Sequence, residues 1–444
     1  MTWKKHLRNA AIIVIALLAG AYWYLSMPDK SRVTLADMQG QAPKLTTPRA
    51  ENFPTINIAK VIGWQGDAKP VAAPGFRVSA FADKLDHPRW MLELPNGDVL
   101  VAESWAPKRQ MRGVEDRIVR RIMSKADGVE TSPDRILLLR DADGDGVAEF
   151  RSDLLSGLHS PFGMALVGNT LYVANTDALV AFPFSVGETK IAAKGTKVMD
   201  LPHNLPNNHW ARNVVAAPDG QWLFITIGSD SNIAEGGMDK EKDRAQIKQY
   251  DIKTRQSIIY AYGLRNPNGL AFNPISGTPW VVVNERDQLG SDGPPDYLTT
   301  VDFGTFYGWP FFYWGGIEDQ RVPQTRQDLK QYTKRPDYAL GPHVASLGLT
   351  FNTGAALGAA YANGAFVGMH GSWNRFPASG YKVVFIPFNE RGFPTGAKPV
   401  DILTGFLDAK GQAQGRPVGV IVDRKGALLV ADDAGNRVWR VTAK

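Results

Sequence analysis

The stretch WMLELPNGDVLVAE at residues 90–103 contains the pattern that decides the fold. Two short apolar runs, at residues 90–94 and 99–103, flank the polar turn sequence Pro-Asn-Gly-Asp. Short apolar runs that are bounded by turn residues are typical of β-strands rather than helices. The stretch therefore predicts two strands joined by a polar turn.

This two-strand unit recurs five more times. The further copies lie at residues 163–175, 214–226, 269–284, 348–368 and 418–432. Six like units at intervals of roughly 50 to 80 residues are typical of a propeller with four-stranded blades. A large β-sandwich is the competing all-β fold, but the units favour an all-β, six-bladed β-propeller across residues 75–444. The strand at residues 437–441 should complete the last blade or close the ring with N-terminal sequence, and residues 239–248 are predicted as a charged surface helix.

Residues 1–27 are predicted as a membrane anchor or a signal segment. A basic head is followed by residues 9–26, an uncharged run of about 18 residues, close to the minimum that spans hydrocarbon. The aromatic residues 22–24 suit the interface between the membrane and water on the side away from the cytoplasm. The small residues 19–21 would suit a cleavage site, but the bulky residues after them favour an uncleaved helix. Both alternatives export the body, so we expect a periplasmic protein, tethered to the inner membrane if the helix is retained.

Composition limits the remaining choices. The chain has no cysteine, which excludes disulfides and thiolate metal sites. Its net charge of +6 is spread out, and the body has no Lys/Arg run that would indicate nucleic-acid binding. Residues 28–74 are rich in Pro, Thr, Gln and Ala and are predicted as a tether that partly packs on the body, with an accessory strand at residues 57–62.

Three polar residues precede inner strands and are candidates for chemistry. His209 lies just before the third unit, and a neutral imidazole can take a hydroxyl proton. Arg265 and Asn266 precede the fourth unit, where a forked cation and an amide can reach a planar ligand rich in acceptors. The structural alternatives are a loop histidine bonded to backbone and an arginine in a salt bridge on the rim.

Two acidic stretches suggest calcium, which prefers hard oxygen ligands. The first is residues 284–288 (Asn-Glu-Arg-Asp-Gln), with Asp292 and Asp296 after them. The second contains Asp141, Asp143, Asp145 and then Glu149, alternating like a calcium loop. This second stretch has Ser152 where such a loop has its last Glu, and it lacks flanking helices, so a plain acidic turn is the alternative.

The stretch YGLRNPNGLAF at residues 262–272 resembles a motif of the glucose/sorbosone dehydrogenase family, propeller enzymes that oxidise sugars with pyrroloquinoline quinone (PQQ). The resemblance covers most of residues 75–442. His209 is followed by a Pro-Asp-Gly turn and by a strand that ends Thr-Ile-Gly at residues 226–228, as in that family. Residues 342–351 and the Gly-Arg-Pro-Val-Gly step at residues 415–419 are similar to the sorbosone branch.

The resemblance implies PQQ and Ca²⁺ as cofactors and gives roles to particular residues. His209 would be the base, Arg265 would steady oxygen charge, and Asn266 would bind PQQ. The carbonyls of Arg286 and Asp287 would hold the catalytic calcium, although this chain has Arg-Asp-Gln where glucose-type enzymes have Gly-Pro. Asp296 and the Tyr307 carbonyl would hold a structural calcium.

Further PQQ contacts are implied at three positions. Arg416 matches one family arginine, but the second falls on Val418 and the family lysine has no counterpart at its position. Arg375 follows the fifth unit and could compensate. His159 lies where the family has an amide touching the quinone, and a structural histidine is the alternative.

Three functions therefore stay open. The first is PQQ- and calcium-dependent oxidation of an aldose or a sugar aldehyde such as sorbosone, with a quinone or cytochrome as electron acceptor. The second is a calcium-dependent lactonase or esterase centred on Asn175, Glu285 and Asp432. The third is a non-catalytic binding propeller.

Overall fold

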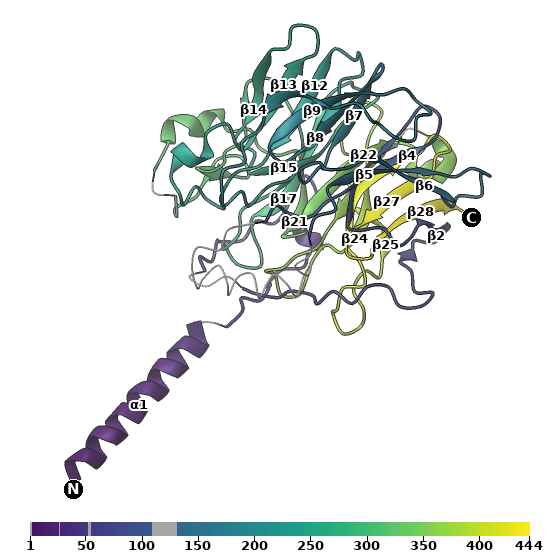
Figure 1. The fold of residues 1–444 in the computed structure, drawn as a ribbon. Coiled ribbons are helices and arrows are strands. Elements are labelled where there is room, and N and C mark those ends of the chain that lie inside the picture. The colour runs from purple at the N-terminus through teal and green to yellow at the C-terminus, as the bar shows by residue number, and fades with distance from the viewer. Residues whose placement is uncertain (1, 26, 52–54, 109–130, 323, 353) are drawn as a thin grey trace.

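The computed structural model describes residues 2–25, 27–51, 55–108, 131–322, 324–352 and 354–444 (Figure 1). Its body contains six sheets of four or five strands, one for each predicted unit. Blade 1 contains β3 (Pro88–Glu93), β4 (Val99–Glu103), β5 (Arg135–Arg140) and β6 (Phe150–Leu155). Blade 2 contains β7 (Met164–Val167), β8 (Thr170–Ala174), β9 (Ala178–Pro183) and β10 (Thr196–Asp200). Blade 3 contains β11 (Val214–Ala216), β12 (Trp222–Ile227), β13 (Gln246–Asp251), β14 (Ser257–Tyr262) and the short parallel strand β18 (Thr305–Phe306).

The other three blades follow the same plan, and two of them include N-terminal strands. Blade 4 contains β15 (Asn266–Phe272), β16 (Pro279–Asn284), β17 (Pro295–Thr300) and β21 (Tyr338–Pro342). Blade 5 contains β22 (Ser346–Asn352), β23 (Gly364–Met369), β24 (Lys382–Pro387), β25 (Val400–Thr404) and β1 (Val71–Ala72). Blade 6 contains β26 (Pro417–Val422), β27 (Leu428–Asp432), β28 (Arg437–Ala443) and β2 (Phe76–Ala82).

The ring closes in two ways. The first strands of successive blades contact one another, and β26 of blade 6 contacts β3 of blade 1. The outermost strand of blade 6 is β2, which pairs antiparallel with β28 and so joins the N-terminal part of the body to its C-terminal end. The all-β, six-bladed propeller is confirmed, and the strand after residue 437 closes the ring with N-terminal sequence.

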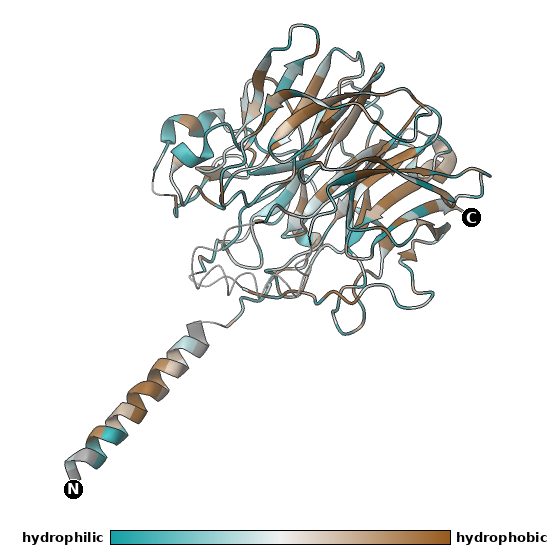
Figure 2. Ribbon diagram, in the orientation of Figure 1, coloured by the Kyte–Doolittle hydropathy of each residue, from teal (hydrophilic) through white to brown (hydrophobic). Residues whose placement is uncertain are grey.

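Close packing between blades explains two glycines of the fifth unit. A Cβ on Gly348 or Gly368 would lie 2.1 or 2.3 Å from the Val418 carbonyl oxygen in blade 6. The second strands are buried throughout, as in β4 and β23, or have one partly exposed end residue, as in β12, because neighbouring blades cover both faces. This burial accounts for their continuous apolar runs, which are brown in Figure 2.

One face of the ring gathers the polar ends of the strands. The start of each first strand pairs with the end of the second strand, as in Pro88 with Glu103, Asn266 with Asn284, and Pro417 with Asp432. Residues just before a first strand and just after a second strand therefore lie together. We call this side the channel face.

Two local predictions are wrong. Residues 239–248 do not form a helix: a short 3-10 turn at Met238–Glu241 is followed by β13, which pairs with β12 and β14. Ile247 and Tyr250 are buried in that sheet, so tertiary pairing outweighs the charged composition. Residues 57–62 are not a strand, because their only ladder contact is the isolated bridge between Val61 and Ala413.

The N-terminal segment consists of α1 (Thr2–Leu25), drawn outside the propeller in Figure 1, and the tether. Among the residues that the structure describes, no helix combines the length and the apolarity needed to cross a membrane. The tether packs on the body: Gly40 bridges to Ala339, and Lys30 bridges to Phe376.

Candidate active site

His209 lies on the channel face, and its surroundings fix which ring nitrogen carries the proton. Its Nδ1 is 2.9 Å from both the carbonyl oxygen and the Oγ of Ser229. The Ser229 hydroxyl already donates to the Ser231 carbonyl at 2.6 Å, so both Ser229 oxygens can only accept from the ring. Nδ1 must therefore donate, which leaves Nε2 as the basic nitrogen of the neutral ring.

Charge and burial keep His209 neutral. Desolvation by the surrounding protein, followed by the nearby positive charge of Arg265, lowers the pKa of His209 well below its ordinary value. The side chain nevertheless keeps partial exposure. A neutral, partly exposed imidazole with a free Nε2 is the form that a general base requires.

A glycine brings His209 and Asn266 close together. A Cβ on Gly228 would lie 2.5 Å from the His209 Cβ and 2.6 Å from the Asn266 Oδ1. The adjacent Ser229 N–H donates to the Arg265 carbonyl at 2.8 Å. His209, Arg265 and Asn266, which the sequence predicted as one site, are thus brought together by the end of β12.

The guanidinium of Arg265 is held on all three nitrogens. Its Nε donates to the Asn232 carbonyl at 3.2 Å, and its Nη1 donates to the Glu285 carbonyl at 2.6 Å. Its Nη2 contacts the Asn232 Oδ1 and the Asp287 Oδ2, both at 3.0 Å. Arg265 is therefore a fixed positive charge rather than a free donor, in a salt bridge as the structural alternative expected, but beside His209 and not on the rim.

Asp287 connects Arg265 to a second histidine. Its Oδ1 accepts from the Asn374 Nδ2 at 2.8 Å and lies 3.5 Å from the His343 Nδ1. Burial alone would raise the pKa of Asp287, but the charges of Arg265 and His343 hold it well below its ordinary value. Burial would lower the pKa of His343, but the hydrogen bond and charge of Asp287 raise it.

Two buried acids, Glu285 and Asp296, lie in this loop and in the strand that follows it. Burial raises the pKa of Glu285 to about 7 and that of Asp296 to about 6. Glu285 Oε2 has no hydrogen-bond partner among the described residues. Asp296 accepts from the backbone N–H groups of Glu285 and Ala345, both at 2.8 Å.

The predicted calcium ligands occupy different surroundings. The Asp287 carbonyl accepts from the Asn232 Nδ2 at 3.2 Å, and the Arg286 side chain pairs with Asp319 at 3.1 Å. The Tyr307 hydroxyl donates to the Thr300 carbonyl at 2.5 Å, and the contacts described for Tyr307 do not include Asp296.

A buried scaffold that was not predicted from the sequence lies under the His209 loop. Asn207 Oδ1 accepts from Arg212 at 3.1 Å and from Arg244 at 2.9 Å, and its backbone N–H donates to Asp230 at 2.8 Å. Arg212 also donates to the His209 carbonyl at 2.5 Å. No local motif marks this network, although all its members lie within the 207–244 region around the base.

A charged cluster, also not predicted from the sequence, lies on the wall formed by blades 5, 6 and 1. Asp433 follows β27 and is contacted by Arg89, by His370 at 2.9 Å and by His87 at 3.5 Å. We call these four residues the Asp433 cluster. Arg416 lies next to it, because the Asp433 N–H faces the Arg416 carbonyl at 3.3 Å.

Arg375 and His159 stand apart from these groups. The Arg375 guanidinium donates to the carbonyls of Ser291 and Pro377, both at 2.8 Å, and to the Ser31 Oγ at 2.9 Å. It therefore joins blade 5 to the tether. His159 is exposed and pairs with Asp177 at 2.9 Å.

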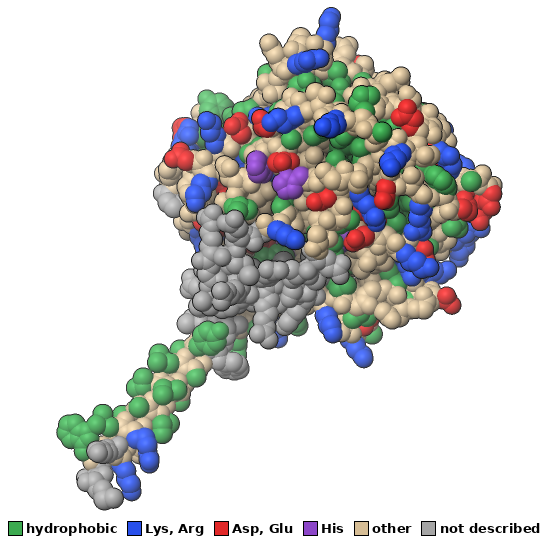
Figure 3. All heavy atoms as spheres, in the orientation of Figure 1, with side chains coloured by type: hydrophobic (Ala, Val, Ile, Leu, Met, Phe, Trp, Pro, Cys, Tyr) green, Lys and Arg blue, Asp and Glu red, His purple; other side chains and the backbone are tan. Residues whose placement is uncertain are grey.

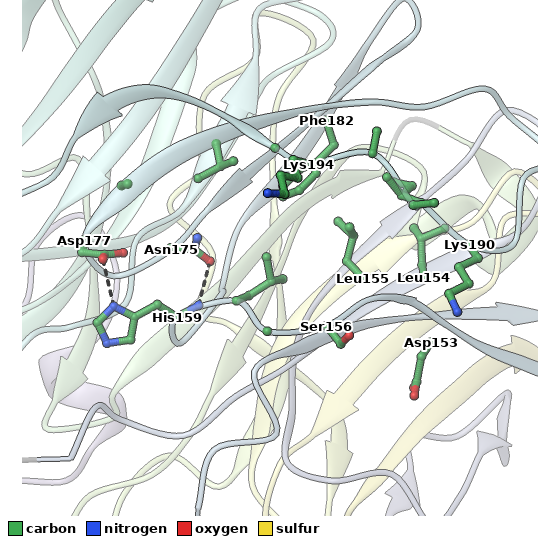
Figure 4. Close-up of a pocket in the computed structure, with 18 residues that line it drawn as sticks. Asp153, Leu154, Leu155, Ser156, His159, Asn175, Asp177, Phe182, Lys190 and Lys194 are labelled. Atoms are coloured by element: carbon green, nitrogen blue, oxygen red, sulfur yellow. Dashed lines mark hydrogen bonds and ion pairs between the residues drawn. The ribbon is translucent and has the colours of Figure 1, made fainter.

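A cavity of about 490 Å³ lies beside His159, between blades 1 and 2 (Figure 4). Its walls include Leu154, Phe182, Lys190 and Lys194. The described contacts of His209, Arg265 and the Asp433 cluster include none of its lining residues, so it is separate from the candidate site.

The acidic loop on the surface has the geometry of a possible cation site. Carboxylate oxygens of Asp141, Asp143, Asp145 and Glu149 lie within 4.8 Å of one another. Its contacts are local turns, such as the Gly144 N–H to Asp141 at 2.7 Å, and an ion pair between Asp141 and Lys425 at 3.4 Å, so calcium there stays a prediction. The face in Figure 3 otherwise mixes acidic and basic side chains without a large patch of one sign.

The residues of the lactonase alternative do not form one centre. Asp432 accepts from the Nε1 of Trp64 and Trp439 at 2.6 and 2.9 Å. The Asn175 Oδ1 accepts from the His159 backbone at 3.4 Å. Asp432 thus binds the tether and its own blade, and Asn175 binds the loop that carries His159.

Comparison with known proteins decides the family. The family model described as TrAA12-like matches residues 70–296 and 317–444. The chain belongs to the TrAA12-like family. The predicted membership of the PQQ-dependent sugar dehydrogenases is confirmed, and this TrAA12-like protein is an oxidoreductase, which removes the hydrolase and non-catalytic alternatives.

Two curated relatives carry informative names. The pyrroloquinoline quinone-dependent pyranose dehydrogenase of Coprinopsis cinerea is 25% identical over 289 residues, which cover 52% of this chain and 39% of the relative. An aldose sugar dehydrogenase of Escherichia coli is 26% identical over 176 residues, 37% of this chain and 46% of the relative. The TrAA12-like chain thus spans less than half the length of each of these relatives.

Solved structures share the fold. A calcium structure of the Trichoderma reesei AA12 family enzyme matches with a TM-score of 0.69 and 19% identity. The match covers 88% of this chain and 99% of the chain in that structure. The holo form of the PQQ domain of the Coprinopsis cinerea pyranose dehydrogenase has a TM-score of 0.68, 20% identity, and covers 87% and 100%.

Proposed function

We propose that this protein oxidises an aldose or a sugar aldehyde of the sorbosone type, with His209 as the base and PQQ and Ca²⁺ as cofactors. The observation that carries the proposal is the forced donation from His209 Nδ1 to Ser229, which leaves Nε2 free to accept a proton. The family assignment supports the cofactor class.

The residues present fit an anionic, planar quinone. Arg89, Arg265 and Arg416 place three nearly buried guanidinium groups on the channel face. Gly228 lets His209 and Asn266 pack directly on the backbone at the end of β12, since a Cβ there would strike both. Arg416 and Asn266 are the residues that would hold PQQ, and the bound quinone would supply a hydride acceptor.

The residues also fit a divalent cation behind the base. Glu285 offers a buried oxygen that lacks a partner among the described residues, and the carbonyls of Arg286 and Asp287 follow it in the chain. A cation there would favour the ionised form of Glu285 and act as a Lewis acid.

The chain's own residues account for the proton and the charge. The reacting carbon is that of the cyclic hemiacetal of an aldose or of the hydrate that water forms with a sugar aldehyde, so that it carries a hydroxyl group. This carbon loses a hydride while its hydroxyl loses a proton, and His209 Nε2 takes that proton. Arg265, fixed by Asp287 and Asn232, disfavours the imidazolium form before reaction and favours negative charge on the substrate oxygen. The Ser229 contacts keep the ring oriented.

Location and electron acceptor are further parts of the proposal. The basic head and the exposed apolar side chains of α1, such as Ile12, Ile15 and Leu18, support export with α1 retained as a tether and with a quinone or cytochrome as acceptor. Fractionation of cells, with mass determination of the mature N-terminus, tests this: a soluble product lacking α1 would contradict it.

The test of the activity is reconstitution of the purified protein with PQQ and Ca²⁺, followed by dye reduction with a panel of aldoses and sorbosone. His209→Ala should lower kcat by about 10²- to 10⁴-fold, the usual contribution of a general base. His203→Ala is the matched control, because His203 lies in the same loop and contacts only the Leu201 carbonyl at 3.1 Å among its described contacts. Full activity in His209→Ala, or a wild-type protein that does not bind PQQ, would contradict the proposal.

A further inference from the structure

The Asp433 cluster places three basic side chains on one buried carboxylate. Asp433 is 1% exposed, and Arg89, His370 and His87 all reach its Oδ2. Arg89 Nε is buried and has no hydrogen-bond partner among the described residues. One carboxylate does not use all the donors that an arginine and two imidazoles offer.

Aromatic rings hold the Arg89 guanidinium in place. Its central carbon lies 5.7 Å from the centre of the Phe162 ring and 5.5 Å from that of Trp210, in blades 2 and 3. Cation–π contacts of this kind fix the plane of an arginine. Since Trp210 follows His209 in the chain, Arg89 contacts the loop that carries the base.

The neighbouring acid does not neutralise this cluster. Asp432 is occupied by the indole N–H groups of Trp64 and Trp439 and by the Arg416 backbone N–H at 2.7 Å. Arg416 itself donates to the Tyr381 hydroxyl at 2.9 Å. The described part of this wall thus presents more positive than negative groups.

Two cationic residues that the family uses to bind PQQ have no counterpart in this sequence, and the Asp433 cluster can take their place. PQQ carries three carboxylates, yet Val418 stands where the family has its second arginine, and the family lysine has no counterpart at its position. The predicted substitute, Arg375, has all three guanidinium nitrogens bonded to Ser291, Pro377 and Ser31.

We propose that Arg89 and His370, both held on Asp433, form the subsite that binds a carboxylate of PQQ in this chain. A planar fork that packs against two aromatic rings matches a carboxylate with two hydrogen bonds, and it loses little conformational freedom on binding. The inference rests on the proposed function, because it assigns residues to the cofactor of that same site.

The test measures binding rather than turnover. The full chain, loaded with Ca²⁺, is titrated with PQQ and in parallel with the PQQ trimethyl ester, and quenching of tryptophan fluorescence gives both affinities. Arg89→Gln should weaken PQQ binding by about 10- to 100-fold, as expected when a hydrogen bond to a charged group is lost. The same substitution should change binding of the uncharged ester by less than about 3-fold.

Three further variants complete the test. Arg140→Gln is the control for loss of charge, since Arg140 pairs with Asp98 at the opposite end of blade 1, and it should bind PQQ like the wild type. Arg375→Gln tests the rival arginine and should also leave PQQ affinity unchanged. Where Arg89→Gln does not fold, His370→Gln replaces it, with a smaller loss of PQQ affinity and none for the ester.

The outcomes separate the two proposals. Equal loss for PQQ and its ester, no loss in Arg89→Gln or in its replacement His370→Gln, or a loss seen in Arg375→Gln instead would overturn the subsite. A wild-type chain that binds neither ligand would overturn the proposed function itself.

Discussion

At the scale of single residues, the buried acids decide how the stability of the cation-free protein depends on pH. Glu285 is 6% exposed, and burial raises its pKa to about 7. The native state therefore retains a proton that the unfolded chain releases above about pH 4.3. The free energy of unfolding should fall as pH rises from about 4 to 7, so this residue destabilises the fold at pH 8 but not at pH 4.

We predict that Glu285→Gln, in the presence of EDTA, raises the free energy of unfolding by up to about 3 kcal/mol at pH 8 and by less at pH 5. Urea unfolding at the two pH values measures this difference. Glu188→Gln, a substitution of an exposed acid, serves as control. If Glu285 helps to bind calcium, saturating Ca²⁺ should remove the advantage of the variant at pH 8. A pH profile that Glu285→Gln leaves unchanged would contradict the assignment of this buried acid.

At the scale of elements, the loop before β11 is the part that must be rigid. Its conformation depends on the buried pair Arg212 and Arg244, which share the Asn207 Oδ1. Burial, followed by the charge of Arg244, lowers the pKa of Arg212 to about 9. The two guanidinium groups therefore repel each other inside the protein. The acceptors of the loop offset that repulsion.

We predict that Arg212→Lys lowers kcat by about 10- to 100-fold. The lysine ammonium has three N–H groups and cannot replace all four contacts of the Arg212 guanidinium, which include the His209 carbonyl, so the base would lose its alignment. The affinity for PQQ should change by less than about 3-fold. Steady-state kinetics and PQQ titration measure the two effects, and Arg255→Lys, at an exposed site, is the control. An unchanged kcat would show that the loop holds His209 without this arginine.

The elements also show what the sequence could predict. The first two strands of each blade carry continuous apolar runs because neighbouring blades cover them, and the six predicted units coincide with them. The third strand of blade 3 is polar and partly exposed, so the charged pattern of residues 239–248 resembles that of a surface helix. His209, Arg265 and Asn266 were found because each precedes a first strand within a motif. Arg89, His370 and Asp433 come from three blades, and only ring closure brings them together.

At the scale of the whole molecule, the tether crosses the channel face along blades 4, 5 and 6. Asp29 accepts from the Ser291 N–H at 2.6 Å, Asn57 donates to the Arg375 carbonyl at 2.7 Å, and Trp64 donates to Asp432 at 2.6 Å. Each contact is made with the last residue of a second strand or with the loop that follows it. The tether therefore connects the three blades that supply Asp287, His370 and Asp433.

Truncation should separate the tether from α1. A chain that begins at residue 28 should keep its Tm within about 2 °C of the full chain, because the described side chains of α1 are exposed. A chain that begins at residue 70 loses the buried Met38, Thr55 and Trp64, and leaves Asp432 and Arg375 short of partners. Its Tm should fall by more than about 5 °C, since each unpaired buried polar group costs about 1–3 kcal/mol. Differential scanning calorimetry of the three chains measures this, and equal melting of the shortest and the full chain would mean that the propeller does not depend on its tether.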